Sequence, residues 1–324
     1  MKVKKRIIKL LASEISSPLI SVEEGVIKEC LENMKYETKR IRKKSNPKKF
    51  RELNIPQPPL IDLQRLILAN LLYKVPVSQA AHCSIKGRSV ITNAKTHRRG
   101  NSFFKIDFKD AFPSVSRIML SRHLEYPLIS KIGIERKDIV DFTNLIIALT
   151  SYKNQLPQGA PTSPYLLNIV CYKLDEEFLM LAKNNGLSYS RYADDLWFSS
   201  SYYSISKDLR ILIVEKIKDY GFRLNRKKVH YRTGTAIAPR ITGVTLTKEG
   251  NRRKLSVSKK YLDNCRAKIY NAAFDNEISE AEILGLMGWI LMVKKRIPPR
   301  LKKPFGIFLR KRCPEKIKNY SHLF

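Results

Sequence analysis

The sequence contains little cysteine for its length. Among 324 residues there are five, and they are far apart with no Cys-x-x-Cys pair: Cys30, Cys83, Cys171, Cys265 and Cys313. An odd, scattered set argues against a disulfide framework and against a zinc site. We expect reduced thiols that fill apolar space.

Long apolar segments are also missing. No run approaches the roughly 20 residues that a helix needs to cross a bilayer. The N-terminus is basic, as in a signal peptide, but Lys9 and Glu14 interrupt the apolar core that such a peptide requires. No strongly amphipathic, lipid-facing stretch is present either. We therefore expect a basic helical segment from Met1 to about Lys44, no membrane partner and a cytoplasmic location.

Acidic residues are scarce beside basic ones. The 29 Asp and Glu face 62 Lys and Arg, which gives a net charge of +33. Such an excess repels itself in a compact monomer unless a polyanion is bound. It predicts affinity for nucleic acid that falls steeply with salt. Residues 251–324 hold 18 Lys or Arg against 6 Asp or Glu, so we expect this segment to grip the backbone of a duplex.

The sequence contains an acidic motif, Tyr-Ala-Asp-Asp, at residues 192–195. The two acids lie between apolar runs at 187–192 and 196–198, a pattern that predicts a hairpin with a tight turn. Neighbouring carboxylates repel each other and lose hydration, so a cation normally lies between them. Oxygen ligands without Cys or His favour magnesium. In so basic a chain this predicts phosphoryl transfer on nucleic acid, although four letters alone also fit a solvated turn.

Two further segments strengthen the prediction of a carboxylate site. In residues 103–113 an apolar strand ends on Asp107. Two strands that end in acids can lie side by side, which lets Asp107, Asp194 and Asp195 converge. Between them in sequence, residues 156–164 contain Gly and Pro, which prevent a regular element and allow the backbone to approach a ligand closely.

In this order, the three segments resemble motifs A, B and C of reverse transcriptases. Residues 221–228 resemble motif D of the same family. Asn-Ala-Lys-Thr-His at 93–97 matches the Asn-Ala-x-x-His signature of bacterial retron reverse transcriptases, and Ile-Thr-Gly at 241–243 is similar to their Val-Thr-Gly triplet. The resemblance runs from about Phe50 to the C-terminus. It departs from the family at 81–87, where Gly and an aromatic residue are usual.

The resemblance implies an α+β right-hand polymerase with fingers, palm and thumb. Residues 1–102 would form the N-terminal helical region and the fingers, including a strand at 48–56 and a helix at 60–72. Residues 103–250 would form the palm, an antiparallel sheet with helices on one face that carries motifs A to D, with some fingers segments interleaved. Residues 251–324 would form a basic helical thumb.

The resemblance also implies a metal site. Asp107, Asp194 and Asp195 would be the catalytic carboxylates and would hold two magnesium ions, with manganese as the alternative ion. One ion would lower the pKa of the primer hydroxyl, and the other would neutralise the pyrophosphate leaving group.

The family likeness further implies a nucleotide site. Phe112, five positions after Asp107, occupies the place of a steric gate against a 2′-hydroxyl; the alternative is an ordinary core phenylalanine. Phe108 belongs to the same nucleotide-binding segment. Gln158 and Gly159 match the loop that supports the incoming nucleotide, unless that loop has a structural role only.

Basic residues are the candidates for contact with the triphosphate. Lys49 and Arg51 carry groups that suit phosphate and would reach it from the fingers strand. The alternative is a solvated basic strand. Lys228 would assist the leaving pyrophosphate by analogy with motif D, but it adjoins two other basic residues.

The two signature segments are the candidates for RNA recognition. Asn93 and His97 are four residues apart and would share one face of a helix. They either engage the RNA or serve the fold, as a lone histidine usually does. Thr242 and Gly243 either contact an RNA stem-loop or form the strand that precedes the thumb.

The implied function is that of a retron-type reverse transcriptase. It would bind its cognate structured noncoding RNA as template and primer, prime from the 2′-hydroxyl of an internal guanosine, and use dNTPs to make branched multicopy single-stranded DNA (msDNA). An effector protein, host RNase H and a role in antiphage defence would accompany it. The alternatives are another bacterial reverse transcriptase (group II intron-like or diversity-generating) and a non-catalytic RNA-binding scaffold. Ser-Pro at 163–164 argues against the diversity-generating group, and the three intact carboxylates argue against the scaffold.

Overall fold

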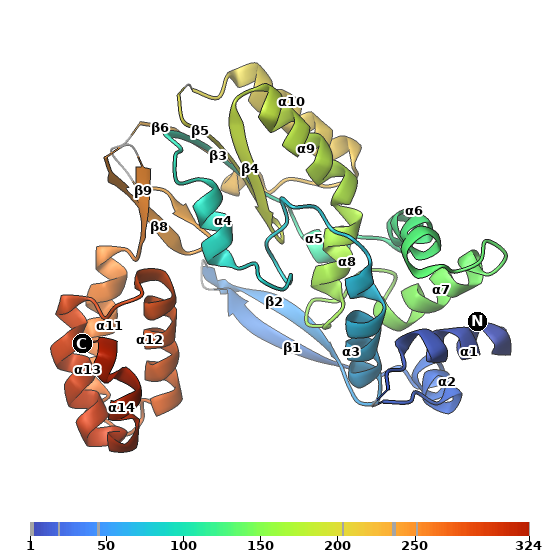
Figure 1. The fold of residues 1–324 in the computed structure, drawn as a ribbon, viewed down its shortest axis with the longest axis horizontal. Coiled ribbons are helices and arrows are strands. Elements are labelled where there is room, and N and C mark those ends of the chain that lie inside the picture. The colour runs from blue at the N-terminus through green and yellow to red at the C-terminus, as the bar shows by residue number, and fades with distance from the viewer. Residues whose placement is uncertain are drawn as a thin grey trace.

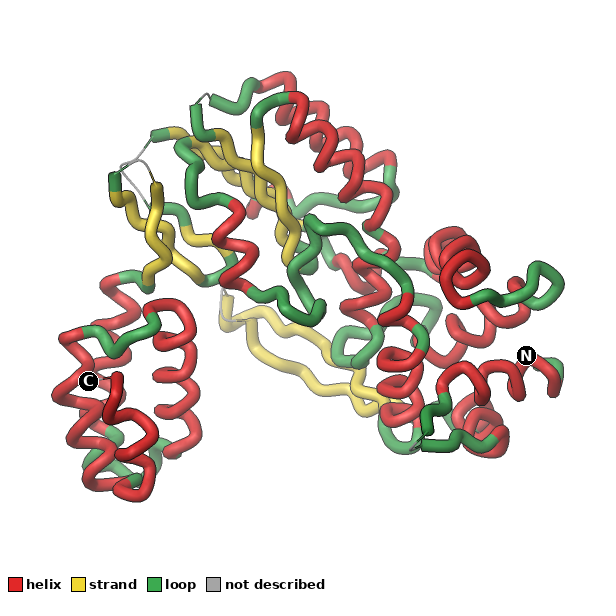
Figure 2. The backbone as a smooth tube through the Cα atoms, viewed as in Figure 1, coloured by secondary structure: helices red, strands yellow, loops and turns green. Residues whose placement is uncertain are grey.

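The computed structural model describes residues 3–18, 20–43, 46–202, 204–234, 238–250 and 252–323. Within these ranges the named strands form three antiparallel sheets, with strand orders β1-β2, β4-β5-β3-β6 and β7-β8-β9. Helices surround the central sheet and make up most of the C-terminal part (Figures 1 and 2). The predicted α+β class is confirmed. No helix in the described ranges has the length and apolar character needed to cross a membrane.

The N-terminal part contains helices followed by a two-stranded ribbon. Helices α1 (Lys5–Ile15) and α2 (Glu24–Glu32) agree with the helical prediction for residues 1–44, of which 1, 2, 19 and 44 lie outside the described residues. The prediction is wrong for β1 (Tyr36–Lys43), which pairs with β2 (Asn46–Pro56). Charged side chains are interspersed along β1 and exposed, so no apolar alternation marks it as a strand.

The predicted strand at 48–56 and helix at 60–72 are confirmed as β2 and α3 (Leu60–Asn70). A 3₁₀ turn, Leu72–Lys74, follows, and then α4 (Val90–Thr96). Ser89 begins α4 by accepting the N–H of Ile91 with its hydroxyl, which satisfies a donor that has no partner within the helix.

The central sheet carries the acidic residues. Its strands are β3 (Ser102–Asp107), β4 (Leu187–Tyr192), β5 (Asp195–Ser200) and β6 (His230–Thr233). β3 lies between β5 and β6, and its register with β5 runs from Ser102 opposite Ser200 to Asp107 opposite Asp195. The acidic ends of two neighbouring strands therefore coincide.

Helices pack on both faces of this sheet, so the expectation of helices on one face only is wrong. On one face lie α9 (Tyr172–Asn184) and α10 (Lys207–Asp219); Phe178 of α9 packs edge-on against Tyr189 and Phe198. The opposite face carries α4, whose C-terminal His97 contacts serines of β4 and β5. The remaining elements between the strands are α5 (Ala111–Ser114), α6 (Arg117–Pro127), a π-helical turn (Leu128–Ile132), α7 (Ile139–Thr150), α8 (Ser163–Val170) and a 3₁₀ turn (Arg226–Lys228).

The C-terminal part begins with a small sheet and continues as helices. The sheet contains β7 (Arg240–Ile241), β8 (Val244–Glu249) and β9 (Arg252–Ser256), so the helical prediction for 251–324 is wrong at β9, where pairing with β8 sets the conformation. The helices are α11 (Lys259–Asn271), α12 (Glu280–Lys294), α13 (Pro299–Arg312) and α14 (Ile317–Tyr320), with 3₁₀ turns at Pro314–Lys316 and Ser321–Leu323.

A second hydrophobic core joins these C-terminal elements to the central sheet. It contains Ile241, Met287 and Phe305 together with Phe103 of β3 and Trp197 of β5. Because this core crosses both expected subdomain boundaries, the division into 1–102, 103–250 and 251–324 stays a prediction.

Candidate active site

Three aspartates lie at one end of the central sheet. Asp107 ends β3 and faces Asp195, the first residue of β5. Asp194 lies in the two-residue turn between β4 and β5, after Ala193, whose φ is +54°. The N–H of Phe108 donates to the main-chain oxygen of Asp194 at 3.0 Å, which ties this turn to β3. The structure thus brings Asp107 next to two carboxylates, those of Asp194 and Asp195, that lie 87 residues or more further along the chain.

The positive charges near this cluster do not balance the negative charges of its three carboxylates. Burial, aided by the charge of Asp107, raises the pKa of Asp194 above its ordinary value. Burial also raises the pKa of Asp195 to about 6, although the ammonium of Lys105, 2.8 Å from its Oδ1, acts in the opposite direction. In the described ranges, no Lys, Arg or His forms an ion pair with Asp194.

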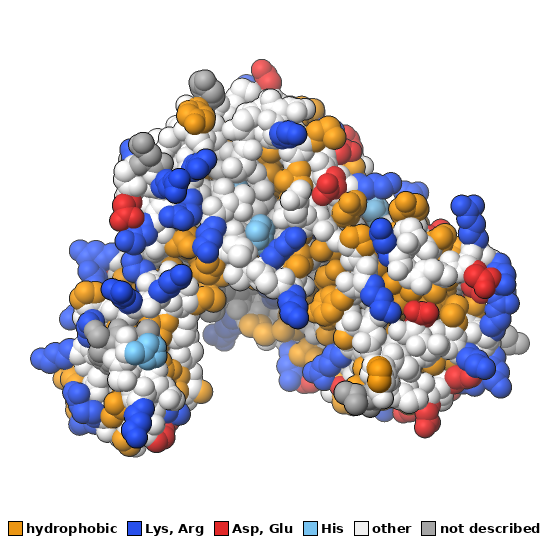
Figure 3. All heavy atoms as spheres, in the orientation of Figure 1, with side chains coloured by type: hydrophobic (Ala, Val, Ile, Leu, Met, Phe, Trp, Pro, Cys, Tyr) orange, Lys and Arg blue, Asp and Glu red, His pale blue; other side chains and the backbone are white. Residues whose placement is uncertain are grey.

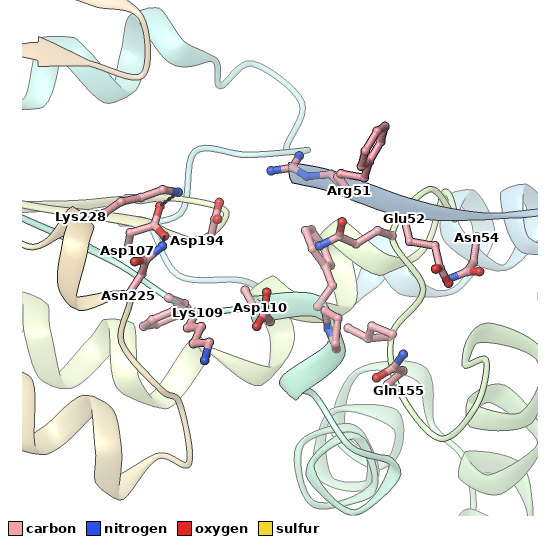
Figure 4. Close-up of a pocket in the computed structure, with 17 residues that line it drawn as sticks. Arg51, Glu52, Asn54, Asp107, Lys109, Asp110, Gln155, Asp194, Asn225 and Lys228 are labelled. Atoms are coloured by element: carbon pink, nitrogen blue, oxygen red, sulfur yellow. Dashed lines mark hydrogen bonds and ion pairs between the residues drawn. The ribbon is translucent and has the colours of Figure 1, made fainter. Parts of the chain in front are cut away.

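Lys228 and Asn225 hold Asp107 from the loop that follows α10. Nζ of Lys228 donates to Oδ2 of Asp107 at 2.7 Å (Figure 4). The main-chain N–H of Asn225 donates to the main-chain oxygen of Asp107 at 2.9 Å. Burial lowers the pKa of Lys228, but its hydrogen bond to Asp107 and the nearby carboxylates outweigh this, so that the net pKa is raised. Of the three consecutive basic residues 226–228, Lys228 is therefore the one that contacts the acids.

The donor set suits a hard divalent cation. Three mutually repelling carboxylates, buried at Asp107 and partly buried at Asp194 and Asp195, offer oxygen ligands of the kind that magnesium prefers. In the described part of the chain, no group of three or more His, Cys, Asp or Glu is already gathered in metal-binding geometry. Instead, the ammonium groups of Lys228 and Lys105 neutralise Asp107 and Asp195. A bound cation would take over this neutralising role.

A cavity of about 300 Å³ opens beside the acids. β2 lies on one side of it, the segment after β3 and the loop at 156–164 lie on the others, and Arg51 reaches from β2 toward Asp194 (Figure 4). Lys49 is exposed on the same strand but is not among the lining residues. The predicted site residues that line the cavity are Arg51, Asp107, Phe108, Phe112, Gln158, Asp194 and Lys228.

The two phenylalanines after Asp107 differ in placement. Phe112, on α5, is half-buried and lines the cavity, where a gate would have to lie. The ring of Phe108 is buried and stacks on Phe222 with 4.4 Å between ring centroids. The nucleotide-binding prediction for Phe108 is therefore corrected for its side chain, since only its main chain can face a nucleotide.

The loop at 156–164 is pinned to β2. The N–H of Asn54 donates to the main-chain oxygen of Gln158 at 2.7 Å. Gly159 has a φ of +111°, and a Cβ at this position would lie 3.2 Å from Cγ1 of Ile55 and 3.3 Å from the oxygen of Asn54. Glycine is required here by both the backbone conformation and the close approach.

A buried ion pair supports the turn that carries Asp194. The guanidinium of Arg191 is fully buried and donates to Asp175 on α9 at 2.6 and 2.9 Å. It also donates to Oδ1 of Asn168 on α8 at 3.0 Å and to the main-chain oxygen of Ala193 at 3.1 Å. The position of the turn is thus set from within the protein.

Comparison with known proteins decides the family. Residues 41–285 match the family described as Reverse transcriptase (RNA-dependent DNA polymerase). The Retron Ec86 reverse transcriptase of Escherichia coli is 30% identical over 270 residues, which cover 83% of this chain and 80% of that protein. The chain belongs to the retron reverse transcriptase family.

Other relatives are longer than the segment that they share. The Retron Mx65 reverse transcriptase of Myxococcus xanthus is 33% identical over 272 residues, covering 79% of this chain and 62% of that enzyme. The chain spans half of the Retron Mx162 reverse transcriptase from the same organism. Among solved structures, apo telomerase from Candida tropicalis aligns with 92% of this chain and 64% of its own at 12% identity and a TM-score of 0.48.

The residues of the first signature segment, Asn93 and His97, lie inside the protein. Ser190 donates to Oδ1 of Asn93 at 2.6 Å, and Nδ2 of Asn93 donates to Thr242 at 3.2 Å. The ring nitrogens of His97 each lie 2.8 Å from a serine hydroxyl, on Ser190 and Ser199. Asn93 and His97 are fully buried. Their predicted direct contact with RNA is therefore corrected to a role in joining α4 to the sheet.

The second signature segment is a turn. Thr242 and Gly243 connect β7 to β8 with φ values of +44° and +92°, so the expectation that they form a strand is wrong. Both are partly exposed, and their contact with RNA stays a prediction.

Several residues of the site were not predicted from the sequence. Lys105 carried a signal, because residues two apart on a strand share a face and it precedes Asp107 by two. Asn225 and Asp175 carried none, because their contacts join segments far apart in the chain.

Proposed function

We propose that this chain is a retron-type reverse transcriptase that copies part of its cognate structured noncoding RNA into branched msDNA. Synthesis starts from the 2′-hydroxyl of an internal guanosine in that RNA. The observation that carries the proposal is the placement of Asp107 and Asp194 beside a cavity that Arg51 and Gln158 also line. Membership of the retron reverse transcriptase family supports the polymerase chemistry.

The residues divide the work of nucleotide addition. Asp107, Asp194 and Asp195 would hold two magnesium ions, which when bound would supply a lower pKa for the attacking hydroxyl and neutralisation of the leaving pyrophosphate. Arg51 binds the triphosphate with its guanidinium. A bound cation would neutralise Asp107 in place of Lys228. The ammonium of Lys228 would then be available to the pyrophosphate.

The partners follow from the same proposal. The net charge of +33 supports binding to the RNA and to its DNA product. dNTPs are the substrates, host RNase H removes the copied template, and an effector protein joins the complex in antiphage defence.

The test is to sequence the nucleic acid that copurifies with the protein after expression with its native flanking DNA. Samples are treated with DNase, RNase or a debranching enzyme. We expect a discrete single-stranded DNA joined to RNA, absent from the Asp194→Asn variant. Asp219→Asn, which alters an exposed acid of α10, is the matched control and should retain the product.

Other outcomes would replace the proposal. RNA alone from both the unsubstituted protein and Asp194→Asn would favour a binding scaffold. Linear or heterogeneous cDNA would favour another type of reverse transcriptase. Thermal unfolding of Asp194→Asn at the temperature of the unsubstituted protein would show that loss of product reflects chemistry and not folding.

A further inference from the structure

A second cavity lies at the other end of the central sheet from the aspartates. Its volume is about 530 Å³, and it is lined where α4 leads into β3, where β5 ends and where β8 meets β9. None of its described lining residues is acidic, and five are basic: Arg98, Arg99, Lys248, Arg252 and Arg253. Lys and Arg side chains gather on the surface over β8, β9 and α4 (Figure 3).

Arg253 is the unusual member of this group, because its side chain is only 3% exposed. Its Nε donates to the main-chain oxygen of Gly100 at 2.8 Å, and one terminal nitrogen donates to that of Leu246 at 3.3 Å. The other terminal nitrogen is buried without a hydrogen-bond acceptor, and in the described ranges no carboxylate forms an ion pair with this guanidinium.

Such an arrangement has a free-energy cost in the absence of an anion. Burial lowers the pKa of Arg253, because the charged form loses hydration. The ring of Phe103, 5.3 Å from the guanidinium carbon, compensates only in part. A buried cation without a counter-charge is usually found where an anion completes the site.

We infer that this cavity binds a backbone phosphate of the structured RNA, with Arg253 at its base and Arg99, Lys248 and Arg252 at its rim. A guanidinium matches two phosphate oxygens at once, which explains why arginine predominates among the lining residues. The three rim side chains are exposed and can follow a chain of phosphates.

The rim also favours a nucleic acid over a free anion. Tyr202 lines the cavity and is 85% exposed, and an exposed aromatic ring is a surface on which an unpaired base can stack. The cavity adjoins the Ser102–Ser200 end of the β3–β5 pair, whereas the acids lie at its Asp107–Asp195 end. The RNA segment that it holds is therefore not the base pair being extended. This inference rests on the proposed function, because it takes a structured RNA as the ligand.

The test uses the full-length protein and RNA transcribed from the flanking DNA. The double variant Arg99→Gln/Arg252→Gln removes two exposed rim charges and leaves the buried bonds of Arg253 intact. We expect the Kd for this RNA to rise about tenfold at physiological salt, and the slope of log Kd against log salt to fall by about two, roughly one per lost phosphate contact.

The charge-matched control is Lys218→Gln/Lys254→Gln. Lys218 lies on α10, and Lys254 is the neighbour of Arg253 on β9, paired with Glu249 at 3.3 Å. Equal Kd values and salt slopes in the two double variants would overturn the inference. Arg253→Lys keeps the charge but loses the planar guanidinium, and we expect it to weaken RNA binding as well.

Two further measurements separate the sources of phosphate and the two proposals. Inorganic phosphate could raise the Tm of the unsubstituted protein but not that of Arg99→Gln/Arg252→Gln. If the two proteins then bind RNA with equal affinity, the site takes free anions and the RNA assignment is wrong.

Extension of an oligo(dT) primer on poly(rA) should be equal in all variants. Loss of extension in every sample with the Kd difference intact would refute the polymerase and leave the RNA site standing.

Discussion

Asp107 and Asp195 face each other across β3 and β5, and each is neutralised by a different lysine. Lys228 pairs with Asp107 at 2.7 Å, and Lys105 pairs with Asp195 at 2.8 Å. Asp194, in the turn beside them, has no such partner among the described residues. The two lysines therefore balance part of the charge of the cluster, and their removal has distinct consequences.

Replacement of Lys228 by alanine should slow nucleotide addition by about tenfold to a hundredfold, because a positioned cation near the leaving group is lost. Single-turnover incorporation of one dNTP measures this rate. Lys227→Ala is the control, since Lys227 is exposed beside it and forms no ion pair with the acids in the described part of the chain. Equal rates in the two variants would remove Lys228 from the chemistry.

Replacement of Phe112 by alanine should weaken the discrimination between deoxyribonucleotides and ribonucleotides. The half-buried ring lines the cavity beside Asp107, where it can exclude a 2′-hydroxyl. We expect the ratio of kcat/KM for dNTP over rNTP to fall by about tenfold, which corresponds to about 1.4 kcal/mol. An unchanged ratio would make Phe112 an ordinary packing residue.

Replacement of Asp175 by asparagine should lower the free energy of unfolding by about 3 to 5 kcal/mol. Its partner Arg191 is fully buried and would keep a charge without compensation. Glu177→Gln is the control on the same helix, because its ion pair with Lys216 is 33–41% exposed and should contribute less than about 1 kcal/mol. Urea unfolding compares the two. A similar loss of unfolding free energy in the two variants would mean that the buried ion pair does not hold α9 to β4.

Stability should fall below neutral pH because His97 is buried and His82 is partly buried, both in the neutral form. Burial lowers the pKa of His97 to about 3 and that of His82 to about 4. Their unfolded pKa values are near 6.5, so below this pH the unfolded chain binds protons that the folded chain does not. The contribution of each is fully present above about pH 6.5 and decreases by up to about 1.4 kcal/mol per pH unit toward the folded pKa.

Urea unfolding between about pH 7 and pH 4.5 measures this dependence. His97→Gln should reduce the slope of unfolding free energy against pH, whereas His230→Gln, at an exposed position, should leave it unchanged. The same slope in both variants would contradict the assignment of the buried histidine.

Much of the active site could be predicted from the sequence because its residues end strands. Asp107 ends an apolar run, the Asp194–Asp195 pair follows the strand at 187–192, and neighbouring strands bring such ends together. The fingers strand and the helix after it also carry local signals. The choice of Lys228 among three basic neighbours needed the structure, since only contact distinguishes them.

The rest depends on contacts that no local pattern records. The sequence predicts a helix at β1 because exposed charges hide the alternation of a strand, and only the pairing with β2 makes this segment a strand. The spacing of Asn93 and His97 predicts a shared helix face, but spacing does not determine whether that face contacts solvent or a sheet. Arg253 lies in a basic segment and reads as a surface residue, yet it is buried between β9 and the segment that precedes β3.

The hydrogen bonds of Arg191 and Phe108 hold the Asp194 turn before any ligand is bound. Arg191 joins that turn to α8 and α9, and the N–H of Phe108 joins it to β3, so the turn is bonded to three surrounding elements. The carboxylate of Asp194 therefore has its position from the fold itself. The β1–β2 ribbon on the other side of the cavity is joined to the loop at 156–164 by the main-chain bond from Asn54 to Gln158. Both walls of the cavity are therefore set when the chain folds.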